Sequence, residues 1–188
     1  MSMLFTLRRV PKDEASSLIQ DPSDIFFFLH GNEPYEPPKS FIQKLFGSKG
    51  EPKPQREWVQ PGEGTVLDLD KNWHVLHYLL SRTPWEGPMP QASLMGGVEL
   101  GKVDVGYGPA RLLAPQQIEE FLNYLGSLNE NEFGSDVTAS ELEENEIYGA
   151  YPEWSPAAAK ELWGYIEELK SFFSKAKSAG ESVILYLY

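Results

Sequence analysis

The sequence predicts an α+β fold, a single domain over residues 1–188 with an antiparallel or mixed sheet packed against several helices. Strand-type segments stand at both ends of the chain, and amphipathic helical patterns lie between them. A chain of 188 residues buries roughly 70% of its unfolded surface, which suits one domain. A strand that closes the chain must pair with another, so we expect the two terminal segments to be neighbours in the sheet.

The N-terminal region contains the first predicted strand and helix. Residues 3–10 are rich in strand-forming side chains, and Pro11 closes the run before a short helix over residues 12–20. The five apolar residues Ile25–Leu29 predict a buried segment, but the run is too short for periodicity to assign it to a helix or a strand.

Residues 32–64 form a proline-rich, irregular excursion. Six prolines and four glycines interrupt any regular pattern there. One short amphipathic helix is predicted over residues 40–46, with Ser40 as its N-terminal cap and Gly47 at its end. The excursion exceeds the about 12–15 residues of an ordinary loop, so we expect it to be functional or mobile.

A strand and a helix are predicted next, over residues 66–70 and 71–81. Trp73, Leu76 and Leu80 repeat at helical spacing, and Asp70 is placed to cap the helix.

Shorter elements follow in a glycine-rich region. Residues 94–95 and 98–105 are strand candidates, residues 106–109 are a tight turn, and residues 111–113 are a short strand. Pro115 opens a helix with one apolar face, made of Ile118, Phe121, Leu122 and Leu125.

The C-terminal region predicts two helices and the last strand. Residues 138–146 form an acidic helical segment. The final helix has Ser155 as cap, Pro156 at its first position and Gly180 at its end. Its apolar stripe is Leu162, Ile166, Leu169, Phe173 and Ala176. The strand at residues 182–188 completes the domain.

Residues 67–80 read Leu-Asp-Leu-Asp-Lys-Asn-Trp-His-Val-Leu-His-Tyr-Leu-Leu. In this run the chain resembles the YfbM-like family of small bacterial proteins, whose domain has no known function. The Gly-Tyr-Gly-Pro-Ala-Arg run at residues 106–111 follows, and then Ile147-Tyr148, Tyr151-Pro152 and Trp154, in the same order as in that family. The resemblance covers residues 1–31 and 65–188. It implies a compact α+β domain and supplies no activity.

Composition excludes several classes of protein. The net charge of −12 repels phosphate backbones and anionic lipids, so we expect neither a nucleic-acid partner nor a membrane partner. No run approaches the about 18 apolar residues of a membrane span, and the N-terminal basic pair follows the apolar stretch instead of preceding it, so we expect a soluble, cytoplasmic protein. Without cysteine there is no thiolate metal site and no cysteine nucleophile.

The first candidate site is a helical stripe of titratable residues. Asp70, His74 and His77 lie at offsets of four and seven residues, and Asp68 stands just before them. Two imidazoles and a carboxylate are a possible ligand set for a divalent metal, although the same residues can serve as a helix cap and as core histidines. We predict no metal and no cofactor, and keep Asp70, His74 and His77 as the weak metal candidates.

The second candidate is the glycine turn that precedes Arg111. Two glycines allow a ligand to approach the backbone, and Arg111 can hold a carboxylate or phosphate. A structural role is favoured instead, with Arg111 paired to a carboxylate such as Asp68, Asp70 or Asp104. Loop aromatics are candidates to line a pocket there: Trp85, Tyr107, Tyr148, Tyr151 and Trp154. The candidate pocket set is Asp68, Asp70, His77, Tyr107 and Arg111.

These patterns support two classes of function. The first is a small acidic module that binds a protein or a small-molecule ligand, one version being an immunity-type protein that neutralises a basic toxin. The second is an enzyme with a His/Arg/Asp acid–base or metal-assisted site. A homo-oligomer fits either class.

Overall fold

Five antiparallel strands form the sheet at the centre of the molecule. The computed structural model describes residues 2–33, 57–150 and 154–188. The strand order is β2-β1-β5-β4-β3, and each neighbouring pair runs antiparallel. The strands are β1 (Phe5–Val10), β2 (Val66–Asp70), β3 (Val98–Asp104), β4 (Pro109–Leu113) and β5 (Ser182–Leu187). The α+β class and the antiparallel option for the sheet are confirmed.

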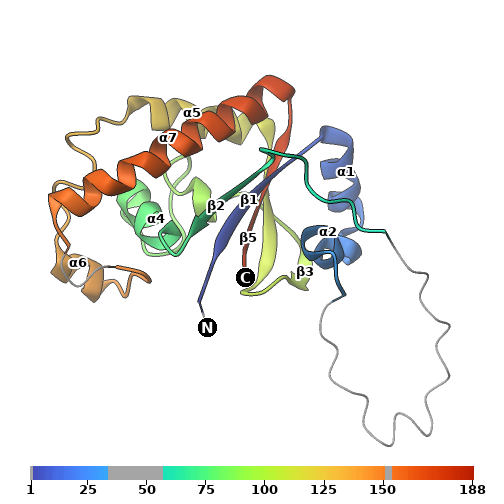
Figure 1. The fold of residues 1–188 in the computed structure, drawn as a ribbon, viewed down its shortest axis with the longest axis horizontal. Coiled ribbons are helices and arrows are strands. Elements are labelled where there is room, and N and C mark those ends of the chain that lie inside the picture. Colours follow the sequence, from blue (N-terminus) through green and yellow to red (C-terminus); the bar gives the residue numbers. More distant parts are fainter. Residues whose placement is uncertain (1, 34–56, 151–153) are drawn as a thin grey trace, which may run out of the picture.

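The first and last strands pair in the middle of the sheet, as the sequence predicts. Phe5 lies opposite Leu187, and Val10 lies opposite Ser182. The backbone pairing continues one step further, because Leu4 and Tyr188 exchange two N–H···O bonds of 2.9 and 3.0 Å. The two ends of the described chain therefore meet at one end of the sheet (Figure 1).

Alternating side chains of the strands build a separate apolar core on each face of the sheet. Phe5, Leu7 and Leu185 point to the face that carries the larger core. That face is covered by α4 (Trp73–Ser81), α5 (Pro115–Ser127) and α7 (Pro156–Ala179), while α1 (Lys12–Gln20), the 3-10 turn η1 (Pro22–Asp24) and α2 (Ile25–His30) lie on the other side (Figure 1). Ile184 and Tyr186 point to this second, smaller core.

Local signals place the ends of several helices correctly. The Ser155 side chain accepts a hydrogen bond from the Ala158 N–H at the start of α7, and Gly180 ends the helix with φ of 66°. Thr138 caps α6 (Ala139–Glu144) in the same way. All five residues of the predicted α7 stripe are buried: Leu162, Ile166, Leu169, Phe173 and Ala176.

Three expectations need correction. Asp70 does not cap α4, because its backbone has φ of 48° and the helix begins at Trp73 after Asn72. Residues 94–95 are not a strand but part of the 3-10 turn η2 (Ser93–Met95). The run Ile25–Leu29 is helical, and only Ile25 and Leu29 are buried, because a helix turns the intervening phenylalanines toward its half-exposed side.

The helix predicted over residues 40–46 lies outside the described residues. The excursion returns to the domain at Trp58, whose indole N–H donates to the Phe28 carbonyl at 3.1 Å. Across the described parts of the chain, every helix is too short or too polar to cross a bilayer.

Candidate functional site

The turn between β3 and β4 is held by its own backbone. The Asp104 carboxylate accepts hydrogen bonds from the N–H groups of Gly106 and Gly108, at 2.8 and 3.0 Å, and these bonds lower the pKa of Asp104. Residue 106 must be glycine, because a Cβ there would lie 2.5 Å from the Tyr188 Cα. The Tyr107 N–H donates to the Leu187 carbonyl at 3.1 Å. Tyr107 is thereby fixed beside the end of β5, with 43% of its surface exposed.

Arg111 lies on β4 and bonds to a carboxylate of the neighbouring strand. It stands directly opposite Glu99 in the register of β3, and its Nη2 lies 3.0 Å from Glu99 Oε1. A carboxylate partner within the domain was expected, but it is Glu99 and none of the three aspartates considered. The Glu99 side chain is 51% exposed and that of Arg111 is 27% exposed. The pair lies at the surface, and it is the hydrogen bond that Arg111 makes with the described residues.

The loop after α4 carries Trp85 to the same region. Arg82 ends the helix in the left-handed conformation, and the Ser81 hydroxyl bonds to both the carbonyl and the hydroxyl of Thr83. The His74 imidazole hydrogen-bonds to the Pro84 carbonyl, and its ring lies 4.6 Å from the Trp85 ring. These contacts hold the Trp85 side chain in place although 46% of its surface is exposed.

These three segments meet around a cavity of about 200 Å³ at the end of the sheet where the chain ends come together. Strand residues Phe5, Leu185 and Leu187 contribute apolar side chains from the larger core, and Tyr107, Arg111 and Trp85 come from the two loops and β4. Among the described residues, the lining consists of Phe5, Trp85, Leu94, Met95, Tyr107, Pro109, Arg111, Leu185, Tyr186 and Leu187.

Two members of the predicted pocket set, Tyr107 and Arg111, line this cavity, and the other three do not. Asp68 and Asp70 are exposed on the edge strand β2, where the Asp70 N–H donates to the Asp68 carboxylate at 2.8 Å. His77 is completely buried in α4. The structure therefore separates the groups that a shared acid–base site would require.

Both histidines of α4 belong to the core. The Nδ1 of His74 accepts a hydrogen bond of 2.9 Å from the Tyr148 N–H, so with Pro84 both of its ring nitrogens are engaged, and burial lowers its pKa. Burial lowers the pKa of His77 to about 4, despite the opposing effect of the Trp85 backbone. His77 Nε2 lies 3.3 Å from the Ser81 hydroxyl, and Nδ1 has no hydrogen-bond partner among the described residues.

Metal binding by Asp70, His74 and His77 does not fit this arrangement. Asp70 lies exposed on β2, whereas both histidines are buried on α4. Within residues 2–33, 57–150 and 154–188, no group of three His, Asp or Glu side chains is placed to hold an ion.

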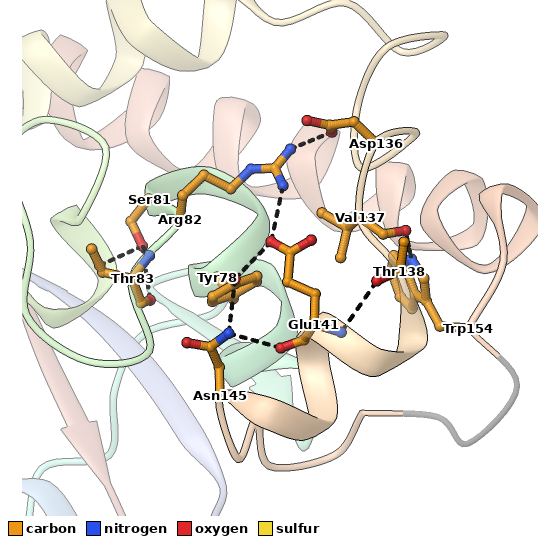
Figure 2. A network of polar contacts seen from close by, with 10 residues as sticks. All are labelled: Tyr78, Ser81, Arg82, Thr83, Asp136, Val137, Thr138, Glu141, Asn145 and Trp154. Atoms are coloured by element: carbon orange, nitrogen blue, oxygen red, sulfur yellow. Dashed lines mark hydrogen bonds and ion pairs between the residues drawn. The ribbon is translucent and has the colours of Figure 1, made fainter.

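A network of polar contacts that the sequence did not indicate connects α4 to α6 (Figure 2). The Tyr78 hydroxyl donates to Glu141 at 2.7 Å and accepts from the Asn145 amide at 3.2 Å. Arg82 pairs with Asp136 and lies 3.7 Å from Glu141. Burial and the Glu141 carboxylate raise the pKa of Tyr78 to about 12. The network connects two helices far apart in sequence, so it is a structural clamp between them.

Trp154 and Tyr148 do not line the cavity. Trp154 is buried and donates its indole N–H to the Val137 carbonyl at 3.0 Å, while the Tyr148 hydroxyl accepts from the Met3 N–H. Tyr151 lies outside the described residues. The strand residues Phe5, Leu185 and Leu187, which also line the cavity, were not predicted as site residues, because their strands meet only in the folded sheet.

Comparison with known proteins gives a family without an activity. The model of a domain of unknown function, DUF1877, matches residues 1–186. The chain belongs to this family. Its fold is similar to the crystal structure of YfbM, a protein of unknown function from Escherichia coli, with a TM-score of 0.63 and 18% sequence identity over 98% of this chain and 99% of that one. No curated protein matches the chain. The expected YfbM-like family is confirmed.

Proposed function

We propose that this DUF1877 domain binds a small molecule in the cavity beside Arg111. The observation that carries the proposal is that two half-exposed aromatic rings, Trp85 and Tyr107, lie beside a concave apolar surface whose described residues include one cation, Arg111. Ligand sites are typically concave and mostly apolar, with a few polar groups that orient the ligand. A ligand that covers these rings removes apolar surface from water, and each Å² so buried contributes about 25 cal/mol of favourable free energy.

Binding alone is proposed, because the cavity does not gather the groups of the alternative acid–base site. Asp68, Asp70 and His77 lie elsewhere, and His74 has both ring nitrogens engaged in the core. Arg111 and Tyr107 remain, and they can position a ligand by hydrogen bonding and stacking.

A thermal-shift screen tests the proposal. The library contains single-ring compounds that are neutral, cationic or anionic, and the proteins are the wild type and the Trp85→Leu variant. A specific ligand at 100 times its Kd stabilises the native state by about 2.7 kcal/mol, which raises Tm by several degrees. We expect hits with the wild type that lose their shift in Trp85→Leu.

The Trp163→Leu variant is the matched control. Trp163 lies on α7, where it is half-buried and contacts Phe133 and Lys170, and it does not line the cavity. This variant should therefore keep the ligand-induced shifts in Tm, measured relative to its own unliganded Tm. A library without hits, or hits that survive Trp85→Leu unchanged, would contradict the proposal.

A further inference from the structure

We infer that the ligand of this cavity is a small organic monoanion, a single-ring carboxylate whose carboxylate group bonds to Arg111. The inference rests on the proposed binding function and adds the chemical class of the ligand.

The charge of the cavity is opposite to that of the protein. The chain carries a net charge of −12, yet Arg111 is the one charged side chain among the described residues that line the cavity. The remaining walls are aromatic, aliphatic or proline side chains. A cation beside low-dielectric walls attracts an anion more strongly than the same cation in open solvent. Arg111 is thus the charged group that a ligand would meet on the described walls of the cavity.

Arg111 has hydrogen-bonding capacity to spare. A guanidinium group carries five N–H donors, arranged to hold a carboxylate through two parallel bonds. Among the described residues, Glu99 is the hydrogen-bond partner of Arg111, and one nitrogen, Nη2, makes that bond. By contrast, the buried Arg8 donates to the Phe28 carbonyl and stacks on the Phe28 ring at 3.8 Å, so its guanidinium is held within the core.

Glu99 does not block access to Arg111. Its side chain is half exposed and does not line the cavity. Exposed ion pairs contribute little stability and are screened by salt. A ligand can therefore share the Arg111 guanidinium with Glu99 or displace Glu99 from it. The Glu99 charge nevertheless opposes an incoming anion, which predicts that its removal strengthens binding.

Size and charge together favour a single-ring carboxylate. The cavity of about 200 Å³ is smaller than the roughly 300–1,000 Å³ of sites for drug-sized ligands. Trp85 and Tyr107 offer ring faces on which a flat apolar body can stack. A phosphate group carries about −1.5 to −2 charges at pH 7, and one cation already shared with Glu99 would leave part of that charge unpaired beside apolar walls.

Calorimetric titration at low salt with matched probes tests the inference. Benzoate, benzamide and benzylamine share one ring and differ in charge, and phenyl phosphate tests the doubly charged anion. We expect benzoate to bind at least about tenfold more tightly than benzamide, because a charge-assisted hydrogen bond exceeds a neutral one by that order. The same margin is expected over benzylamine, whose charge has the same sign as that of Arg111, and over phenyl phosphate, whose second charge would stay unpaired beside apolar walls.

Two variants of the ion pair should act in opposite directions. Arg111→Lys should weaken benzoate binding about tenfold, since an ammonium group cannot form the two parallel bonds. Glu99→Gln should strengthen benzoate binding. Arg9→Lys is the matched control, because Arg9 is also a strand arginine paired with a glutamate, Glu181 at 2.6 Å, and lies outside the cavity. This control should leave the affinity unchanged.

The outcomes separate the ligand class from the binding function. If benzamide, benzylamine or phenyl phosphate binds as tightly as benzoate, or if Arg111→Lys keeps the benzoate affinity, the carboxylate class is wrong while Trp85-dependent binding still stands. If neither the four probes nor the wider screen gives binding that depends on Trp85, the proposed function itself fails.

Discussion

At the scale of single residues, burial controls the ionisation of His77. Its imidazole is inaccessible to solvent in α4, and its pKa falls to about 4. In the unfolded chain a histidine titrates near 6.5, so between pH 6.5 and 4 the unfolded state binds a proton that the folded state does not. The free energy of unfolding must therefore decrease as the pH falls through this window.

We predict that this difference in pKa removes about 3 kcal/mol of stability between pH 6.5 and pH 4. Urea melts of the wild type and of His77→Gln at several pH values measure it, and the variant should show a shallower dependence because glutamine does not titrate. NMR titration of the wild-type imidazole supplies a second check. An imidazole that titrates near pH 6.5 would show that burial does not hold His77 neutral.

Arg111 should contribute little to folding. Its partner Glu99 is half exposed, and exposed ion pairs are worth about 0–1 kcal/mol. Arg111→Lys should therefore lower the free energy of unfolding by less than about 1 kcal/mol in denaturant melts, with Arg9→Lys measured alongside. A loss above about 2 kcal/mol would assign Arg111 a mainly structural role.

The Tyr78 hydroxyl should matter more, because it joins two helices. Tyr78→Phe removes one bond to the Glu141 carboxylate and one from Asn145, and we expect a loss of about 1–2 kcal/mol in the same melts. Tyr188→Phe is the matched control, since the Tyr188 hydroxyl makes no side-chain hydrogen bond among the described residues. Equal losses in the two variants would contradict the role of Tyr78 as a clamp between α4 and α6.

At the scale of elements, α7 anchors the larger core. Phe173 is fully buried, and its ring meets that of Phe121 on α5 edge-on at 5.1 Å. Phe173→Ala should cost about 3–5 kcal/mol through lost burial and the cavity left behind. Glu168→Ala, on the exposed side of the same helix, should change stability by less than about 0.5 kcal/mol. A cost below about 1 kcal/mol at Phe173 would mean that α7 packs differently.

Elements with strong local signals could be predicted from the sequence. The cap at Ser155, the apolar stripe of α7 and the end of the helix at Gly180 are each determined by residues close together in the sequence. The same holds for the turn before Arg111. The run Ile25–Leu29 could not be assigned, because its helical form depends on packing against the second face of the sheet. Asp70 has the residue type of a cap, but the chain turns there with a positive φ and the helix starts later.

The candidate site was predictable only in part, for the same reason. Tyr107 and Arg111 are close in sequence, and a glycine turn followed by a cation is visible in the sequence alone. Offsets of four and seven residues also suggested that Asp70 and His77 share a surface, but the strand ends at Asp70 and His77 points into the core. Helical spacing indicates which residues share a stripe and does not tell whether that stripe faces solvent or protein.

At the scale of the whole molecule, the cavity exists because the sheet brings the two ends of the chain together. Phe5 at the start of β1 and Leu187 at the end of β5 are opposite each other in register, and both line the cavity. The loop with Trp85 and the turn with Tyr107 come from the middle of the sequence and also line the cavity. A site assembled from residues as far apart in sequence as Phe5, Trp85 and Leu187 depends on the complete fold.

A crystal structure of the wild-type protein with benzoate tests the central claim most directly. The account predicts benzoate in the cavity, with its ring against Trp85 and its carboxylate oxygens about 2.7–2.9 Å from the guanidinium nitrogens of Arg111. An empty cavity at a benzoate concentration that saturates the protein in solution, or a benzoate bound elsewhere, would contradict it.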